Sequence, residues 1–391
     1  MCPQFDSAGR HHFINADKTA CCSSISPFYS VTKSLGMSKS LDSYRQRIAV
    51  TGGAGFIGSN LLLMLVPKYP DYLFVNIDSL TYAANLSNLE SIAKSPDYRF
   101  EKIDICNYRE LENCFSKYDI NGVIHLAAES HVDRSIIGPA EFIRTNIDGT
   151  FNLLELSRRL KEKDSTFRFL HVSTDEVYGS AGENETFTEN APFRPNSPYA
   201  ASKAAADHMV RSYNRTYELD TVITNCTNNY GPYQFPEKLI PLVIYNAINN
   251  KPIPIYGDGT NERDWLYVKD HCEALDLAFH NGRTGESYNI SANKIIPNID
   301  LVKRVCAILD KMRGDGPREN LIQFVTDRPG HDRRYALDSN KFRKEFNWQP
   351  SENFENALET TVKWYVENEY WLKNCISGDY LKYYETVYAN R

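Results

Sequence analysis

A short apolar run, a glycine-rich turn and an apolar helical pattern follow one another near the start of the chain. Ile48 to Val50 predicts a buried strand, and Leu61 to Leu65 predicts the helix that follows it. The turn between them contains Gly52, Gly55 and Gly58. Glycines at such positions let the backbone approach a pyrophosphate and let the helix pack closely on the strand. A plain tight turn would also explain the three glycines.

Strand-like runs recur after this unit and alternate with helical patterns. They are Tyr72 to Ile77, Tyr98 to Ile103, Gly122 to Leu126, Phe167 to Leu170 and Thr221 to Thr227. Such alternation is typical of an α/β protein with a Rossmann-type, doubly wound parallel sheet. After the last of these runs the alternation loosens, which predicts a smaller C-terminal substrate-binding domain.

Asp78 follows the second strand, about twenty residues after Gly58. A carboxylate at this place would hydrogen-bond the ribose 2′-hydroxyl of a dinucleotide and repel a 2′-phosphate. The sequence therefore predicts NAD rather than NADP.

The segment His171 to Gly179 reads His-Val-Ser-Thr-Asp-Glu-Val-Tyr-Gly and puts Thr174, Asp175 and Glu176 at the end of a strand. Two neighbouring carboxyls suit a site that removes a proton from one carbon and protonates a leaving oxygen on the next, provided that their environments differ. Alternatively, Thr174 and Asp175 cap a following helix and Glu176 is a solvated acid in its first turn.

A helix is predicted to start at Ser197-Pro198, with Ser197 as its cap. Tyr199 and Lys203 then lie on one face of it. A nearby ammonium and a nicotinamide cation would lower the pKa of the phenol, so that Tyr199 could accept an alcohol proton. An ordinary surface pair of Tyr and Lys is the alternative.

Composition limits the classes of function. The 391 residues carry a net charge of -6, which argues against a nucleic-acid surface, and no apolar run is long enough to span a membrane. The nine cysteines form no Cys-x-x-Cys pair, so no metal site is predicted and a cytoplasmic protein is expected.

Three segments are predicted. Residues 1–45 are polar and are expected to be a disordered extension, 46–228 an NAD-binding Rossmann domain, and 229–391 a substrate domain with segments that return to the first. The last segment has cations, Lys238, Arg263 and Arg328, that could clamp a diphosphate. It also includes an expected closing helix, Phe354 to Leu372.

Several motifs together resemble the nucleotide-sugar 4,6-dehydratases of the extended short-chain dehydrogenase/reductase superfamily. The resemblance runs from about Ile48 to the closing helix and rests on residues 51–58, 125–135, 173–179, Tyr199-x-x-x-Lys203, 228–241, 263–268 and 327–335. The Asp175-Glu176 pair is the specific part, because epimerases and decarboxylases of the superfamily lack it.

The resemblance implies a reaction in three steps on a nucleotide sugar, with dTDP-glucose expected. Tyr199, assisted by Lys203 and Thr174, would take the 4-hydroxyl proton while C4 gives its hydride to NAD. Glu176 would remove the C5 proton, Asp175 would protonate the departing C6 hydroxyl, and the hydride would return to C6. UDP-glucose is the main alternative substrate, and a non-catalytic NAD-binding sensor or scaffold is the alternative of another class.

The resemblance also implies the ligand contacts and a homodimer built on helices 146–159 and 199–213. The residues expected to contact the cofactor, besides Tyr199 and Lys203, are Gly52, Gly55, Phe56, Ile57, Gly58, Asp78, Ser79, Leu80, Thr81, Asp104, Ile105, Leu126, Ala127, Ala128, Ser130, Thr145 and Asn229. Those expected to hold the sugar nucleotide are Ser130, Thr174, Asn228, Lys238, Leu239, Pro254, Tyr256, Arg263, Asn289, Arg328 and His331. No metal is expected to take part.

Overall fold

The structure, a computed structural model, describes residues 39–376. Most of the expected N-terminal extension, residues 1–38, lies outside this range. Residues 39–45 are part of the fold, because Tyr44 is buried and donates a hydrogen bond to the Pro96 carbonyl at 2.7 Å, and Lys39 pairs with Asp97 at 2.6 Å. The boundary predicted at residue 45 is therefore wrong, and the fold begins no later than Lys39.

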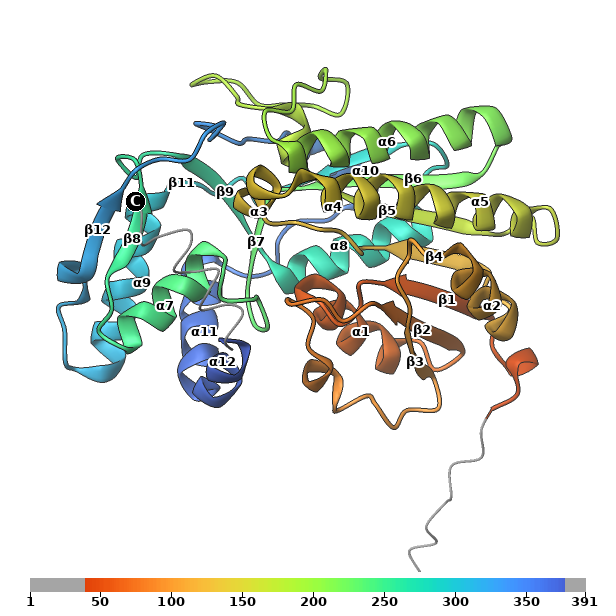
Figure 1. Cartoon of the computed structure of the whole chain (residues 1–391), viewed down its shortest axis with the longest axis horizontal. Coiled ribbons are helices and arrows are strands. Elements are labelled where there is room, and N and C mark those ends of the chain that lie inside the picture. The colour runs from red at the N-terminus through yellow and green to blue at the C-terminus, as the bar shows by residue number, and fades with distance from the viewer. Residues whose placement is uncertain (1–38, 377–391) are drawn as a thin grey trace, which may run out of the picture. The chain divides into compact units, whose positions relative to one another are not determined.

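A seven-stranded sheet forms the centre of the described region (Figure 1). Its strands lie in the order β10-β6-β5-β4-β1-β2-β3, and every neighbouring pair is parallel. Their bounds are β1 Gln46–Thr51, β2 Tyr72–Asp78, β3 Tyr98–Lys102, β4 Gly122–His125, β5 Arg168–Thr174, β6 Asp220–Cys226 and β10 Ser287–Ile290. The order reverses at β1 and β4, and ligands of such folds bind at the carboxyl ends of the strands at this point. The predicted fold class is confirmed.

Helices cover the two faces of the sheet (Figure 1). α1 (Phe56–Lys68) packs against α8 (Val268–Asn281) on one face, and α2 (Tyr108–Tyr118), α5 (Gly149–Lys161) and α6 (Pro198–Tyr217) pack on the other. Because side chains alternate along a strand, Ile48 and Val50 of β1 join one core and Ala49 joins the other. The inner strands of the sheet are therefore apolar on both faces, whereas the edge strand β3 has Arg99 and Glu101 on one face.

The predicted start of α6 is confirmed. Ser197 is the N-cap and accepts a hydrogen bond from the Ala200 backbone N–H at 3.1 Å, and Pro198 is the first helical residue. The helix expected at 146–159 begins earlier, with α4 (Pro139–Ile143) and a π-helical turn (Arg144–Asp148) that leads into α5. The shorter elements of this half are 3-10 turns at Leu41–Ser43, Leu86–Leu89 and Asp175–Tyr178, and helix α3 (Val132–Ile137).

The chain beyond β6 builds two small sheets and five further helices in the described residues. β7 (Asn228–Tyr230) pairs with β9 (Glu262–Tyr267), which pairs with β11 (Ile295–Pro297), and β8 (Ile253–Tyr256) pairs with β12 (Ile322–Val325). The helices are α7 Leu239–Ile248, α9 Asn298–Arg313, α10 Asn340–Phe346, α11 Phe354–Glu367 and α12 Glu369–Cys375, and a 3-10 turn lies at Arg318–Leu321. Since β10 and α8 return to the large sheet, the boundary expected between 228 and 229 stays a prediction.

The expected closing helix is two helices. α11 ends at Glu367 and α12 starts at Glu369. Asn368 interrupts them, because its side-chain amide and its backbone N–H both donate to the Trp364 carbonyl, at 2.8 and 2.9 Å. On either side of the break, the ring centroids of Trp364 and Trp371 lie 5.1 Å apart.

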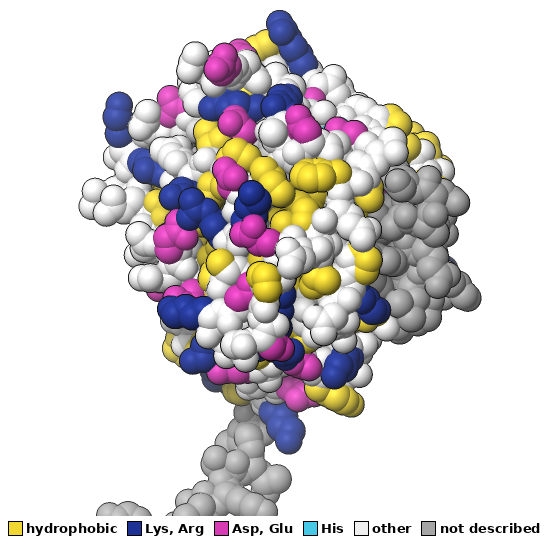
Figure 2. Space-filling model, turned by 90° about the vertical axis from the view of Figure 1, so that its left-hand side faces the viewer, with side chains coloured by type: hydrophobic (Ala, Val, Ile, Leu, Met, Phe, Trp, Pro, Cys, Tyr) yellow, Lys and Arg dark blue, Asp and Glu magenta, His cyan; other side chains and the backbone are white. Residues whose placement is uncertain are grey.

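Charges of both signs are interspersed on the face that Figure 2 shows, rather than gathered into a basic patch. Ion pairs also join α9 to α11, such as Arg304 with Glu355 and Lys311 with Glu359. Within residues 39–376, no helix combines the length and the apolar character that a membrane span requires.

Candidate active site

The glycine turn forms a cradle at the end of β1. Gly52 has a φ of +71°, and a Cβ there would lie 2.7 Å from the Ala127 backbone nitrogen. A Cβ at Gly58 would lie 2.2 Å from the Gly52 carbonyl oxygen, so only glycine lets α1 pack this close to the turn. At Gly55 the nearest atom is the Gly52 oxygen at 3.3 Å, which leaves its other side open at the N-terminus of α1. This arrangement fits a pyrophosphate.

Asp78 lies at the end of β2, as expected for a ribose contact. Its carboxylate accepts hydrogen bonds from the backbone N–H groups of Ala54, at 3.0 Å, and Leu80, at 2.8 Å. Burial raises the pKa of this carboxyl, and the two backbone hydrogen bonds oppose that rise. Asp78 is thereby held in one orientation beside the glycine turn.

A cleft of about 430 Å³ runs along the carboxyl ends of the strands and gathers most of the expected cofactor residues. All of the predicted cofactor contacts line it except Leu80, whose backbone has a φ of +57° and is held by Asp78. Ser130, Thr174, Asn228 and Lys238 of the expected substrate contacts also line it. The residues present therefore fit NAD, and several expected substrate contacts line the same cleft.

The acid pair lies at the end of β5, where the chain turns into the 3-10 turn Asp175–Tyr178. Thr174 caps this turn, because its hydroxyl accepts a hydrogen bond from the Glu176 backbone N–H at 3.3 Å. The same hydroxyl donates to Asp175 Oδ1 at 3.1 Å. Asp175 is 3% exposed, and its Oδ2 has no hydrogen-bond partner in the described part of the chain. Thr174 therefore caps the turn while Asp175 beside it is a buried acid.

The two carboxyls have different electrostatic environments. Burial raises the pKa of Asp175 well above its usual value, and the charge of Glu176 raises it further. Burial also raises the pKa of Glu176, but the cations Arg328, Lys238 and Arg263 oppose that rise. Asp175 is thus the carboxyl that keeps its proton, and Glu176 is the one that ionises more readily. Glu176 is half-buried in the first turn of this 3-10 helix, so part of the alternative, a capped turn with an acid in its first turn, is present together with the acid pair.

Tyr199 and Lys203 enter the cleft from α6. Both are buried, at 8% and 4% exposed, so they are not a surface pair. Lys203 donates to the Val172 carbonyl at 2.8 Å, and burial lowers its pKa to about 8 against the charge of Asp207. Burial and then Glu176 raise the pKa of the Tyr199 phenol, while a hydrogen bond from Thr174 lowers it. The expectation that Lys203 and a nicotinamide cation together lower the pKa of Tyr199 stays a prediction.

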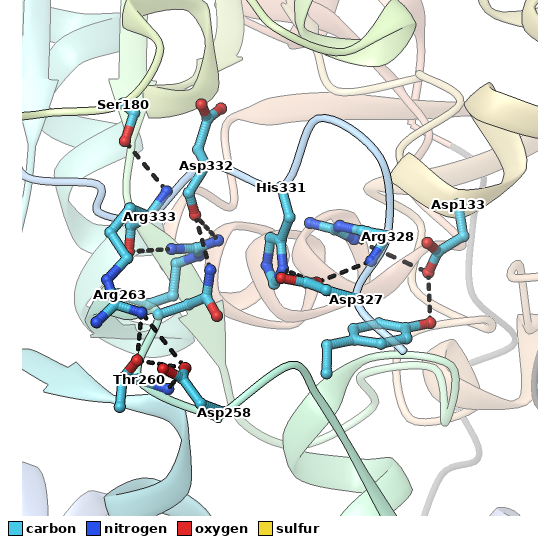
Figure 3. Close-up of polar contacts among 12 residues, drawn as sticks. Asp133, Ser180, Asp258, Thr260, Arg263, Asp327, Arg328, His331, Asp332 and Arg333 are labelled. Atoms are coloured by element: carbon cyan, nitrogen blue, oxygen red, sulfur yellow. Dashed lines mark hydrogen bonds and ion pairs between the residues drawn. The ribbon is translucent and has the colours of Figure 1, made fainter. Parts of the chain in front are cut away.

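Figure 3 shows a basic cluster that contains Arg263, Arg328 and His331. Arg328 and Arg263 lie close enough to Glu176 to lower its pKa. Arg263 comes from β9, and Arg328 and His331 come from the loop after β12. The Arg328 guanidinium is 3.8 Å from Asp133, and its Nε has no hydrogen-bond partner in the described part of the chain. Arg263 donates to the Asp332 carbonyl at 2.9 Å, which fixes its direction. The cluster therefore has donor capacity left for an anion.

The predicted substrate contacts Tyr256 and His331 lie in the same region. The Tyr256 hydroxyl donates to Asp133 at 3.2 Å, and its ring meets that of His331 edge to face, with centroids 6.0 Å apart. His331 Nδ1 is 2.6 Å from Asp327 Oδ1. Pro254 lies on the same strand as Tyr256, and Leu239 starts α7 directly after Lys238.

Asn289 does not contact the cleft, and its predicted role in holding the sugar nucleotide is wrong. The residue is fully buried in β10. Its side-chain nitrogen donates to the carbonyls of Phe187, at 2.9 Å, and Asp338, at 3.4 Å, and its oxygen accepts from Tyr178 at 3.0 Å. These bonds use both of its donors inside the protein.

The sequence analysis missed a polar contact across the cleft. Glu237 accepts hydrogen bonds from the Tyr82 hydroxyl, at 2.8 Å, and from Arg134, at 3.1 Å. The Arg134 guanidinium lies 3.7 Å from the centre of the Tyr82 ring. These three residues tie the loop after β2 to the segment before α7. In the sequence, the only signal for a functional role of Glu237 is its position next to Lys238.

Comparison with known proteins gives consistent matches. A profile of the family described as GDP-mannose 4,6 dehydratase matches residues 49–361. The dTDP-glucose 4,6-dehydratase of Neisseria meningitidis is 51% identical over 346 residues, which are 86% of this chain and 97% of that protein. The structure of dTDP-glucose 4,6-dehydratase from Bacillus anthracis in complex with NAD has a TM-score of 0.75 at 45% identity, covering 84% of this chain and 99% of that one. For the NAD-bound enzyme from Streptomyces venezuelae the TM-score is 0.78 at 43% identity, covering 84% and 100%.

The doubly wound sheet with its glycine cradle, and a buried Tyr and Lys on one helix, define an enzyme of the extended short-chain dehydrogenase/reductase class. Within that class, the neighbouring carboxyls Asp175 and Glu176 indicate a dehydratase. The chain belongs to the nucleotide-sugar 4,6-dehydratases, and the relatives that it matches over nearly their whole length are dTDP-glucose 4,6-dehydratases. The family predicted from the motifs is confirmed.

We expect Gly58→Ala to weaken NAD binding by roughly 5- to 150-fold, because overpacking costs about 1 to 3 kcal/mol and each 1.4 kcal/mol is about tenfold in affinity. The added Cβ would meet backbone atoms of the cradle. Calorimetric titration of cofactor-stripped protein measures the effect. Gly138→Ala is the matched control, since its nearest atom would be the Arg134 oxygen at 3.9 Å. Equal affinities in the two variants would contradict the proposed cradle.

Proposed function

We propose that this protein is an NAD-dependent hydro-lyase that converts dTDP-glucose to dTDP-4-keto-6-deoxyglucose and water. The observation that supports it most is the pair of buried Asp175 and half-buried Glu176, whose environments favour one protonated and one ionised carboxyl. The pair lies next to Tyr199 in the cleft that fits NAD. The relatives named above support dTDP as the nucleotide.

Oxidation at C4 uses α6. Tyr199 accepts the proton of the 4-hydroxyl, and Thr174 at its side orients the hydroxyl that reacts. Bound NAD would supply the hydride acceptor at C4 and later the donor at C6, and its positive charge would lower the pKa of the phenol. Lys203 donates a hydrogen bond to the Val172 carbonyl, which holds its ammonium group on the same face of α6 as Tyr199.

Elimination uses the acid pair. The ketone at C4 makes the C5 proton acidic, and Glu176 removes it. Asp175 then gives its proton to the C6 hydroxyl, which leaves as water. Both steps suit the surroundings described above, because the cations beside Glu176 favour its ionised form and burial favours the protonated form of Asp175.

The basic cluster is the proposed diphosphate site. Arg263, Arg328 and Lys238 all lie close enough to Glu176 to affect its pKa, so a diphosphate held by them would place the attached sugar near the acid pair. The free Nε of Arg328 provides an unused donor. Asn228, whose Oδ1 also lacks a partner among the described residues, lines the cleft on the same side.

The alternatives considered from the sequence are not favoured. UDP-glucose differs in its base by one methyl, which a pocket distinguishes by only about 1 to 3 kcal/mol, but the curated relatives are dTDP-glucose dehydratases. A non-catalytic NAD-binding sensor would not need the acid pair, Tyr199 and Lys203 together, and all four are present and buried or half-buried in the cleft.

We expect the pure protein to convert dTDP-glucose to the keto-deoxy sugar nucleotide without added metal. Parallel incubations with UDP-glucose and GDP-mannose are the controls, and mass spectrometry detects the loss of water. We expect kcat/KM for dTDP-glucose to exceed that for UDP-glucose by roughly 10- to 200-fold. Turnover of UDP-glucose at an equal or higher kcat/KM would overturn the substrate assignment, and no turnover of any sugar would overturn the enzymatic one.

We also propose a homodimer, formed through the helices beside the cleft. Apolar side chains are exposed there on neighbouring helices: Ile137 of α3, Ile143 of α4 and Phe151 of α5 are 64%, 53% and 43% exposed. An exposed apolar patch of this kind is typical of an interaction surface. The helices α4, α5 and α6 lie side by side (Figure 1), so two copies could bury them together.

We expect light scattering to give twice the chain mass of 44.8 kDa for the wild type. The double variant Ile143→Lys, Phe151→Lys should shift it toward one chain mass, because two ammonium groups would have to be buried. Tyr370→Lys is the matched control, since Tyr370 is 80% exposed on α12. A wild type of one chain mass, or a double variant that stays dimeric, would contradict the proposed interface.

A cytoplasmic location and a role in deoxysugar synthesis, rhamnose being one such sugar, are the remaining parts of the proposal. The cysteines in residues 39–376 are all free, which suits a reducing compartment.

A further inference from the structure

Two segments that are far apart in the sequence line the cofactor cleft and are bonded to each other. Thr81 and Ala83 line the cleft from the loop after β2. Phe235 and Glu237 line it from the segment between β7 and α7. The Tyr82 hydroxyl of the first segment donates to Glu237 Oε1 of the second at 2.8 Å. A bond between two side chains, 155 positions apart, therefore joins these two walls of the cleft.

A third residue, Arg134 of α3, strengthens this contact. Its Nε donates to Glu237 Oε2 at 3.1 Å, and its guanidinium lies 3.7 Å from the centre of the Tyr82 ring. Glu237 is only 7% exposed, so its carboxylate depends on these two donors in place of water. The Tyr82 ring also meets the Phe235 ring edge to face, with centroids 5.6 Å apart. We call Tyr82, Arg134 and Glu237 the cleft bridge.

Two further hydrogen bonds connect the same segments to the glycine cradle. The Asn85 backbone N–H donates to the Ala54 carbonyl at 2.9 Å, which joins the loop after β2 to the glycine turn. The Asn60 side chain on α1 donates to the Pro232 carbonyl at 3.0 Å, which joins the other segment to this helix. Together with the cleft bridge, these bonds close a ring that includes the glycine turn and the start of α1. A pyrophosphate in the cradle would lie at this ring.

The cleft bridge is the one link of this ring that side chains alone provide. Tyr82 does not itself line the cleft, whereas its neighbours Thr81 and Ala83 do. Its hydroxyl therefore acts on the position of the walls and adds no contact to the cofactor. A bridge of this kind controls how readily a cleft opens.

We propose that the cleft bridge is a latch that retains NAD in the protein from one turnover to the next. While the bridge is formed, the two walls stay together, so a dinucleotide in the cradle leaves slowly and also enters slowly. Retention suits the proposed reaction, because the hydride taken from C4 returns to C6 of the same sugar. That benefit rests on the proposed function, whereas the latch rests on the contacts described above.

Tyr82→Phe tests the latch, because it removes the hydroxyl and keeps the ring. The protein is loaded with NAD deuterated on its nicotinamide, mixed with excess unlabelled NAD and separated by rapid gel filtration, and mass spectrometry of the retained cofactor gives the exchange rate. We expect exchange to be faster than in the wild type by roughly 10- to 100-fold, the contribution of a hydrogen bond to a charged group. The dissociation constant from calorimetry of cofactor-stripped protein should change by less than about threefold, because entry becomes faster as well.

Tyr69→Phe is the matched control. Its hydroxyl also donates to a buried carboxylate, Asp276, at 3.0 Å, and neither residue lines the cleft, so exchange should match the wild type. Glu237→Gln breaks the bridge from the other side and should also speed exchange. Combined with Tyr82→Phe, its effect should be smaller than the product of the two single effects, because both changes break one bridge.

Three results would overturn the latch. The first is an exchange rate in Tyr82→Phe equal to that of the wild type. The second is a loss of affinity as large as the gain in exit rate, which would make Tyr82 a cofactor contact, and the third is a double variant whose two effects multiply. If Tyr82→Phe does not fold, exchange and affinity in Glu237→Gln decide between the same outcomes.

Failure of the latch and failure of the proposed function are distinguishable, since NAD exchange needs no sugar nucleotide. A wild type that makes no product from dTDP-glucose would overturn the proposed function and leave the exchange measurements valid.

Discussion

The site depends on the burial of two neighbouring carboxyls at the end of one strand. Removing Asp175 and Glu176 from water disfavours the charged form of each, and their proximity disfavours charging both. Cations from distant parts of the chain lower the pKa of Glu176 more than that of Asp175, because Arg263 acts on both carboxyls while Arg328 and Lys238 act on Glu176. Unequal surroundings of this kind suit the proposed roles of Asp175 as acid and Glu176 as base.

The fold provides those surroundings by its topology. Parallel strands end at one edge of the sheet, so the glycine cradle after β1, Asp78 after β2 and the acid pair after β5 share one cleft. The helix after the acid pair adds Tyr199 and Lys203, and the smaller sheets bring the cations over the same edge. Thr174 shows how closely structure and chemistry are combined, because one hydroxyl caps a turn and also donates a hydrogen bond to Asp175.

Local patterns predicted the strands, the cap at Ser197 and nearly all of the cofactor cleft, because apolar runs, helix caps and glycine turns act within a few residues. Features that depend on distant partners were not predictable in this way. Asn289 was expected in the site, but its side-chain amide instead donates hydrogen bonds to the carbonyls of Phe187 and Asp338. The raised pKa of the Tyr199 phenol results mainly from burial. The hydrogen bond between Tyr82 and Glu237 joins residues that are 155 positions apart in the chain. The break at Asn368 arises from a side chain that competes with the helix backbone.

A carbon-13 NMR titration of the side-chain carboxyls tests the central claim most directly, with Asp175→Asn and Glu176→Gln used to assign the two signals. The account predicts that both carboxyls titrate above the ordinary range of their residue types and that Asp175 keeps its proton to a higher pH than Glu176. An Asp175 that ionises at its ordinary pKa, or at lower pH than Glu176, would contradict the assignment of acid and base.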